Sequence, residues 1–213
     1  MEKELKLNIL DKKRKTLLPL LREFKNEFYL AGGTALALQL GHRKSFDFDF
    51  FALNGFNLTN LKKKAESLFK NHTANIIQLE ADTFTILIDD EIKISFFKIT
   101  DKQITPLIES EWFSICDELE IGAMKISALL RAAYRDYVDI YFLLKKYKLK
   151  EIINLCERKY QSFEVSVYLK AIISYDDIEI TPINFAAGYE RKPKEIFTFI
   201  KNQTLEYLTK YAR

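Results

Sequence analysis

The hydrophobic pattern near the start of the chain predicts an amphipathic helix over residues 11–28. Apolar side chains recur there at intervals of three and four residues, and this spacing places them on one helical face. Asp11 stands where an N-cap residue would accept hydrogen bonds from the first turn. A short apolar stretch over residues 28–31 follows. The apolar positions of the helix are Leu17, Leu18, Leu21, Phe24 and Phe28.

A glycine pair, Gly32-Gly33, then opens a second predicted helix over residues 34–40. After it, residues 45–53 alternate polar and apolar side chains, which is the pattern of a strand with one polar face. The alternation places Asp47 and Asp49 on one face and the phenylalanines between them on the other. The order is therefore extended stretch, helix and strand.

The middle of the chain continues with mixed elements. Residues 58–69 have helical spacing, and three strand-like runs follow them, at residues 74–79, 83–88 and 91–99. Asp89-Asp90 separates the last two runs and suits a tight hairpin turn.

From residue 121 onward the pattern is helical to the end of the chain. This change predicts an α+β domain over residues 1–120, followed by a helical domain over residues 121–213. The loop at residues 182–188 interrupts the second domain. Its predicted helices are residues 121–146, 149–160, 164–173 and 193–211.

Composition narrows the class of protein. The chain holds only 6 Gly and 4 Pro in 213 residues, so it is expected to form long regular elements with short connections. It has no run of 18 apolar residues and no signal-peptide pattern, which predicts a cytoplasmic protein without a membrane partner. Cys116 and Cys156 are expected to be reduced core thiols, because they have no CxxC motif or nearby histidine for a zinc site, and a lone disulfide is not expected in a protein without an export signal.

The net charge of +3 is too small to indicate nucleic-acid binding by itself. The last 25 residues hold more cations than acids, however, and the excess includes Arg191, Lys192 and Lys194. A solvated helix face would explain this excess, and so would contact with a polyanion.

Chemistry is concentrated between residues 30 and 50. Two aspartates separated by one residue on a strand project to the same side, so that both can reach one magnesium ion. A glycine pair before a helix lets the backbone approach phosphate oxygens, and the helix N-terminus supplies N–H donors. Alone, each feature also fits simple alternation or an ordinary turn. Together they indicate binding of a metal–triphosphate complex.

The same segment resembles a known family. Its GGTALAL, GHRKS and DFDFF runs are similar to the AbiEii/AbiGii branch of the polymerase-β-like nucleotidyltransferases, which includes toxins of toxin–antitoxin and phage-abortive systems. A downstream block, KISALLR followed by RDYVDIY, resembles the second motif pair of that branch. The resemblance covers roughly residues 28–144. It implies a nucleotidyltransferase fold with a mixed sheet.

The resemblance also implies roles for individual residues. Gly32, Gly33 and Thr34 would line the phosphates, while Asp47 and Asp49 would hold Mg²⁺ or Mn²⁺. From their position just before the metal strand, Arg43 and Ser45 would support this site or contact phosphate. A structural or substrate-contact role is favoured for His42 over ligation of the metal. In the downstream block Lys125 would neutralise phosphate charge, with Asp136 and Asp139 as further catalytic candidates.

The downstream block can be tested against helix geometry. Asp136 and Asp139 follow Lys125 by eleven and fourteen residues, so in one continuous helix both would return near the face of Lys125. A bend near Arg131 would remove this argument. Without the resemblance, a helix with a solvated charged face would explain the same residues.

One position departs from the wider superfamily, in which a later strand often carries a third carboxylate. The corresponding strand here begins at Glu91 and has Ser95 where the acid would stand. A serine hydroxyl is a weak metal ligand and a poor base. Either Asp136 or Asp139 replaces the missing acid, or the chemistry is weak or absent.

Three functions remain open at this stage. The first is an enzyme that transfers a nucleoside monophosphate from an NTP to an acceptor, which would be a tRNA 3′ end, another RNA or a protein hydroxyl. As a toxin, it would have a cognate antitoxin. The second is a module with little or no catalysis that binds nucleotide, RNA or a protein partner. The third is a phosphotransferase that uses the same metal site.

Overall fold

The structure, a computed structural model, describes residues 4–52, 54–99 and 101–211. Leu53 at the end of the predicted strand and Arg213 at the end of the predicted helical domain lie outside these residues. The chain divides into two compact units. The first comprises residues 1–100 and 107–116, and the second comprises residues 101–106 and 117–213.

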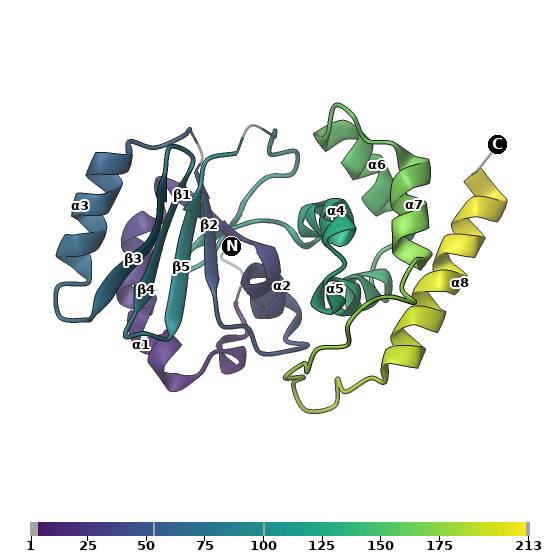
Figure 1. The fold of residues 1–213 in the computed structure, drawn as a ribbon, viewed down its shortest axis with the longest axis horizontal. Helices are drawn as coiled ribbons and strands as arrows, with labels where there is room; N and C mark the ends of the chain where they lie inside the picture. Colours follow the sequence, from purple (N-terminus) through teal and green to yellow (C-terminus); the bar gives the residue numbers. More distant parts are fainter. Residues whose placement is uncertain (1–3, 53, 100, 212–213) are drawn as a thin grey trace. The chain divides into compact units, whose positions relative to one another are not determined.

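The first unit is built on a mixed sheet with the strand order β3-β4-β5-β2-β1-β7-β6 (Figure 1). Strand β2 runs parallel to β5, and β1 runs parallel to β7, whereas the other neighbouring pairs are antiparallel. The predicted α+β class with a mixed sheet is confirmed. The strands are β1 (Phe28–Ala31), β2 (Phe48–Ala52), β3 (Ala74–Glu80), β4 (Thr83–Ile88), β5 (Ile92–Phe97), β6 (Ile108–Glu109) and β7 (Ser114–Ile115).

The turn between β4 and β5 forms where the sequence predicts it. Asp89 and Asp90 both have left-handed backbone angles, with φ of 51° and 56°. Aspartate tolerates this conformation better than most residues do. The Glu91 N–H donates to the Ile88 carbonyl at 3.1 Å and closes the turn.

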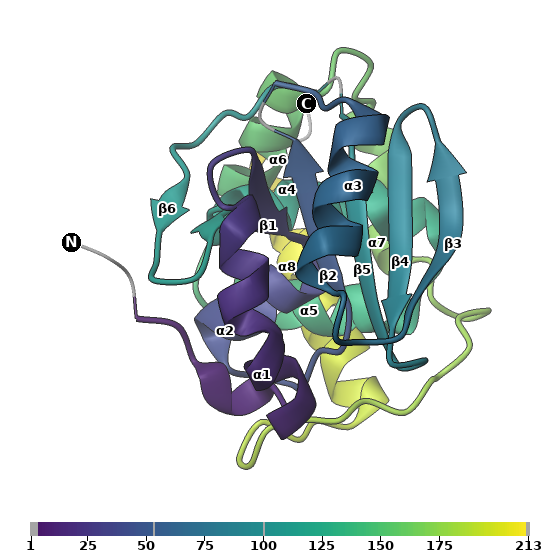
Figure 2. The ribbon, with the colours of Figure 1, turned by 90° about the vertical axis from the view of Figure 1, so that its left-hand side faces the viewer.

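Helices cover both faces of this sheet. Helices α1 (Lys12–Leu21) and α3 (Leu58–Leu68) lie on one face, and α2 (Gly32–Leu40) lies on the other (Figures 1 and 2). Asp11 caps α1, because its side chain accepts from the backbone N–H of Arg14 at 2.9 Å. Two short 3₁₀ turns flank α1, η1 (Leu7–Ile9) and η2 (Arg22–Phe24).

Aromatic side chains fill the space under α1 and α3. Phe24 lies 4.8 Å from Phe96 between ring centroids, and Phe50 stacks on Phe96 at 5.3 Å. All three rings are buried. Because side chains alternate along β2, burying Phe48 and Phe50 on this face turns Asp49 to the opposite face.

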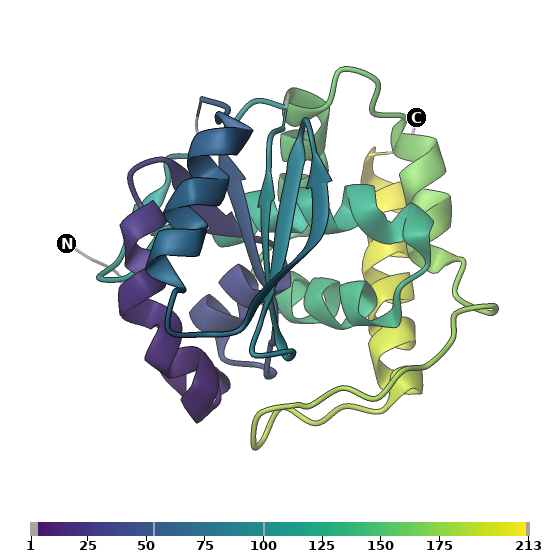
Figure 3. The same ribbon diagram turned by 60° about the vertical axis from the view of Figure 1, so that its left-hand side comes forward.

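The second unit is built from helices joined by loops, the longest of which covers residues 174–192 between α7 and α8 (Figure 3). The helices are α4 (Glu118–Ala128), the short η3 (Leu129–Arg131), α5 (Tyr134–Leu144), α6 (Leu149–Lys159), α7 (Val165–Ile173) and α8 (Pro193–Tyr211). The predicted continuous helix over residues 121–146 is wrong. It breaks at Ala132, which has a left-handed φ of 54°, so that α4 and α5 are separate helices packed on each other.

A buried carboxylate explains why residues 101–106 belong to this unit. Glu120, on α4, accepts hydrogen bonds from the backbone N–H groups of Ile104 at 3.0 Å and Thr105 at 2.7 Å. The Lys159 ammonium lies 2.8 Å from the same carboxylate and donates to the Lys102 carbonyl at 2.8 Å. This network attaches the segment to α4 and α6.

Among the described residues, none of the helices combines the length and the apolar content needed to cross a membrane.

Candidate functional site

The glycine pair and the second aspartate meet where β1 passes into α2. In the antiparallel β1–β2 ladder Ala31 stands opposite Asp49, so the next residue, Gly32, is placed beside the aspartate. Gly32 has a left-handed φ of 70°, and a Cβ added to it would lie 3.1 Å from Oδ2 of Asp49. Glycine therefore allows both the backbone turn and the close approach of the carboxylate.

Helix α2 begins at this point and gives the site its electrostatic character. Gly32 and Gly33 form its first turn and are half-buried. Their N–H groups belong to the set that a helix leaves without intrahelical partners at its N-terminus. The positive end of the helix dipole favours an anion here, so both the Asp49 carboxylate and a phosphate group suit this position.

Asp47 lies one residue before β2, and its side chain is 36% exposed. The strand thus starts three residues later than the predicted residue 45. Asp47 and Asp49 nevertheless both alternate with the buried Phe48, and both are half-buried. Two carboxylates at alternating positions, each open to solvent on one side, supply the oxygen ligands that Mg²⁺ and Mn²⁺ take alongside water and phosphate. The residues present fit a divalent metal carried by a nucleotide.

Thr34 and Ser45 hold the segment that carries Asp47. The Thr34 hydroxyl donates to the backbone carbonyl of Asp47, and its oxygen lies 2.7 Å from Oγ of Ser45. Since Thr34 has one hydroxyl proton, Ser45 is the donor in that second contact. Both side chains are buried. They fasten the segment before β2 to α2, while direct contact of either side chain with phosphate stays a prediction.

Arg43 and His42 are also buried in this segment. Arg43 donates from Nη1 to the backbone carbonyl of Lys44 at 3.1 Å. The arginine therefore takes part in shaping the loop after α2, and its predicted contact with phosphate stays a prediction.

Strand β5 provides no third acid. In the parallel β2–β5 ladder Ser95 stands directly beside Asp49. This is the strand position at which the wider superfamily often carries the third acid. Ser95 is buried and accepts from the Thr85 hydroxyl at 3.3 Å. Within residues 4–52, 54–99 and 101–211, no group of three or more acidic, histidine or cysteine side chains is arranged to hold a metal. This site has two carboxylates.

Lys93 was not among the residues singled out from the sequence. It precedes Ser95 by two residues on β5, and its Nζ lies 3.6 Å from Oδ2 of Asp47. The alternation of β5 could have indicated its face, but its neighbour on β2 depends on strand order, which the sequence pattern does not give.

The downstream block forms a separate cluster in the second unit. Nζ of Lys125, on α4, lies 2.6 Å from Oδ1 of Asp136 and 2.7 Å from Oδ2 of Asp139, both on α5. Arg131 lies 3.7 Å from the other oxygen of Asp136. Lys125 and both aspartates are buried. These residues come together because α4 packs on α5, whereas the sequence predicted that one continuous helix would align them.

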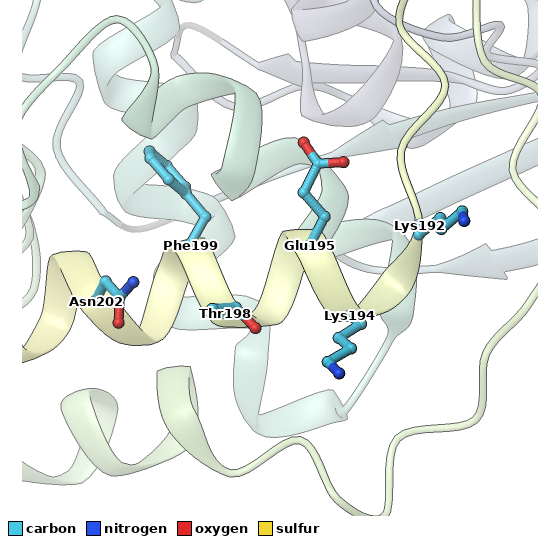
Figure 4. A pocket seen from close by; sticks show the side chains of 6 residues that line it. All are labelled: Lys192, Lys194, Glu195, Thr198, Phe199 and Asn202. Atoms are coloured by element: carbon cyan, nitrogen blue, oxygen red, sulfur yellow. The ribbon is translucent and has the colours of Figure 1, made fainter.

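A shallow cavity of about 480 Å³ lies along the N-terminal half of α8 (Figure 4). It has one acid and two lysines and lacks a pair of carboxylates, so it does not suit a metal. Its lining residues are Lys192, Lys194, Glu195, Thr198, Phe199 and Asn202.

Most of the chain matches a known family. The family model described as "Nucleotidyl transferase AbiEii toxin, Type IV TA system" matches residues 20–206. An uncharacterised protein of Aquifex aeolicus (strain VF5) is 31% identical over an alignment of 194 residues, and the match covers 86% of this chain and 89% of that protein.

Two solved structures share the fold. One is a candidate nucleotidyltransferase from H. pylori, with a TM-score of 0.65 and 17% identity over 95% of this chain and 98% of that chain. The other is JHP933 from Helicobacter pylori, with a TM-score of 0.62 and 16% identity over 95% of each chain. At such low identity the likeness supports the fold alone.

Proposed function

We propose that this chain, which belongs to the AbiEii nucleotidyltransferase toxin family, transfers a nucleoside monophosphate from an NTP to a hydroxyl of an acceptor. In this reaction the acceptor oxygen bonds to the α-phosphorus, the bond to the β-phosphate oxygen breaks, and pyrophosphate leaves. One observation carries the proposal: Gly32, at the start of α2, lies close to the Asp49 carboxylate. Asp47 precedes Asp49 by two residues, so the second carboxylate belongs to the same strand segment.

Each part of the site would have a distinct task. Asp47 and Asp49 would hold the Mg²⁺ or Mn²⁺ ion, which supplies positive charge to the triphosphate when it is bound. The N–H groups of Gly32 and Gly33 would donate to phosphate oxygens. Thr34 and Ser45 would keep the aspartate segment against α2, as their hydrogen bonds indicate.

The Lys125 cluster would take a second part in the reaction. We propose that Lys125 contacts the triphosphate and that Asp136 and Asp139 set the position of its ammonium. The buried lysine has two carboxylate contacts, at 2.6 and 2.7 Å, which hold the side chain in one orientation. A preoriented cation stabilises developing phosphate charge without reorganisation at the moment of reaction.

Replacing the two aspartates tests the metal site. The Asp47→Asn/Asp49→Asn variant should bind a Mn²⁺ complex of a non-hydrolysable NTP analogue at least about tenfold more weakly in calorimetry, because two charged ligands are lost. Asp82→Asn removes an exposed carboxylate from the same unit and is the control, with unchanged binding. Wild-type affinity in the double variant would refute the proposed site.

The proposed acceptor is RNA, with a protein hydroxyl as the competing acceptor. The cations at the start of α8 support RNA, because Lys192 and Lys194 are exposed and line one shallow cavity, where they can contact phosphate groups. Incubating the protein with each α-labelled NTP and total cell extract, and then separating RNA from protein, would show which class receives the label.

The family description also supports a toxin role with an antitoxin as partner. Induced expression in a bacterial host should arrest growth for wild type and not for Asp47→Asn. Arrest by both would point to toxicity without nucleotidyl transfer.

A module that binds nucleotide with little catalysis is the second candidate. It is favoured by one observation, the neutral Ser95 beside Asp49 where a third carboxylate would stand. Tight nucleotide binding in calorimetry, combined with no label transfer to any acceptor, would support this function.

A further inference from the structure

Strand β5 brings a positive charge to the carboxylate face. In the parallel ladder Phe48 pairs with Ile94 and Asp49 with Ser95, so one residue earlier Asp47 and Lys93 are side by side. The Lys93 Nζ lies 3.6 Å from Oδ2 of Asp47. The two side chains are close because the strand register places their backbone positions side by side, in addition to the rotamer that the long lysine side chain adopts.

The ammonium changes the charge balance of the site. Asp47, Asp49 and Lys93 together carry a net formal charge of about −1, whereas an acid in place of the neutral Ser95 would make this charge about −2. A free divalent cation is therefore attracted less strongly, and it must compete with Lys93 for Asp47. A metal that arrives with a triphosphate brings its own negative charge, and this charge attracts the lysine.

We propose that Lys93 is a phosphate-binding residue of this site, which pairs with Asp47 in the absence of ligand and moves to the triphosphate when a metal–nucleotide complex binds. This inference rests on the proposed function. The Lys93 and Asp47 side chains are 41% and 36% exposed, so water screens their pair and exchanging the partner costs little. The four-carbon stem and the three donors of lysine suit such a movement. The site consequently takes the metal as its nucleotide complex and binds the metal alone weakly.

The decisive property is that Lys93 should oppose one ligand and favour the other. We therefore compare Mn²⁺ alone with Mn²⁺ plus a non-hydrolysable NTP analogue, using calorimetry. Lys93→Gln should bind Mn²⁺ alone about threefold more tightly, since a competing cation is removed. It should bind the Mn²⁺–nucleotide complex about tenfold more weakly, on the order of one charged hydrogen bond to phosphate.

Two further variants complete the experiment. Lys98→Gln makes the same charge change at an exposed lysine just after β5 and should leave both affinities unchanged. Lys93→Arg keeps the charge and should retain more nucleotide affinity than Lys93→Gln. Circular dichroism confirms folding, which an exposed substitution is expected to preserve.

The results separate this inference from the proposed function. Loss of Mn²⁺–nucleotide binding in Asp47→Asn, together with unchanged affinities in Lys93→Gln, would overturn the role of Lys93 and leave the site standing. A parallel change of both affinities in Lys93→Gln would also overturn it. Unchanged binding in Asp47→Asn would refute the proposed function and this inference together.

Discussion

At the scale of single residues, Gly32 links backbone conformation to the carboxylate it faces. Gly32→Ala should lower the free energy of unfolding by about 1–2 kcal/mol, because a Cβ is strained at its φ of 70°. The added carbon would also lie 3.1 Å from Oδ2 of Asp49 and displace that carboxylate. Urea unfolding should show the first effect, and weaker Mn²⁺–nucleotide binding in calorimetry should show the second.

Gly55 provides the matched control for this prediction. It lies in the same unit with a similar φ of 77°, and a Cβ there would meet only the flexible end of Lys98, at 3.5 Å. Gly55→Ala should therefore have the backbone cost without any loss of nucleotide affinity. Equal affinities for the two alanine variants would contradict the role given to Gly32.

Sequence reasoning located the residues whose chemistry is local. Strand alternation placed Asp47 and Asp49 on one face, and the glycine pair preceded a predicted helix. Both features could be found without knowing the fold. The proximity of Gly32 to Asp49 could not, because it depends on the antiparallel pairing of β1 with β2. Lys93 was missed for the same reason, since its neighbour comes from the β2–β5 pairing.

At the scale of elements, Lys125 was predicted to lie near Asp136 and Asp139 because all three were placed on one continuous helix, and that helix is wrong. The chain has no glycine or proline between Lys125 and Leu144, so the pattern indicated one helix. Ala132 nevertheless adopts a left-handed conformation and splits it. The lysine still meets Asp136 and Asp139, because α4 packs on α5 and brings the three side chains together. Buried charges of opposite sign stabilise each other at such short distances.

The stability of this pair can be tested with Lys125→Met. Removing the ammonium takes away a positive charge 2.6 and 2.7 Å from two buried carboxylates, which should lower the free energy of unfolding by about 3–5 kcal/mol. Adding Asp136→Asn and Asp139→Asn should restore part of that loss, because the two neighbouring buried negative charges disappear. Urea unfolding of the single and triple variants measures both effects. No recovery in the triple variant would contradict the electrostatic explanation. Nucleotide affinity of Lys125 variants is meaningful only where folding is retained.

The attachment of residues 101–106 predicts a dependence on pH. Burial raises the pKa of Glu120, but hydrogen bonds from Lys159, Thr105 and Ile104 outweigh it, and the net pKa lies below the ordinary 4.5. Its stabilisation is therefore complete above pH 4.5 and is lost as the pH falls through the lower folded-state pKa. Glu120→Gln should cost about 1–3 kcal/mol at pH 7.

This difference between wild type and Glu120→Gln should shrink as the pH falls below 4.5. Urea unfolding followed by circular dichroism at pH 7 and at several acidic values measures it. A difference that stays constant with pH would mean that folding leaves the pKa of this carboxylate unchanged, and a difference that grows as the pH falls would mean that folding raises it.

At the scale of the whole molecule, the order of helices and strands along the chain was enough to predict the fold class. Mixed elements followed by helices predicted the α+β class, which the strand pairing confirms. Two features were not accessible. Strands β6 and β7 are two residues each, too short for a periodic signal. The membership of residues 101–106 in the second unit depends on buried hydrogen bonds to Glu120, which no local pattern indicates.

The cations near the C-terminus belong to the same scale, because they concern how the molecule meets an acceptor. Arg191 is already engaged: its Nε lies 3.1 Å from Glu195, and its Nη1 donates to the Glu190 carbonyl at 2.7 Å. Lys192 and Lys194 are exposed along the α8 cavity (Figure 4). The two lysines are therefore better placed than Arg191 to contact a phosphate backbone.

The resulting prediction is that Lys192→Ala/Lys194→Ala weakens RNA binding and leaves NTP binding unchanged. Each lost contact with a single strand should reduce the slope of log affinity against log salt by roughly 0.7, since fewer counterions are released. Fluorescence anisotropy with labelled RNA at several salt concentrations measures this slope. Lys12→Ala/Lys15→Ala removes two exposed lysines from α1 and controls for net charge. If both double variants lose affinity equally, the effect is one of overall charge. If the α8 variant keeps wild-type affinity and slope, α8 is not part of the acceptor site, and a protein hydroxyl becomes the better candidate.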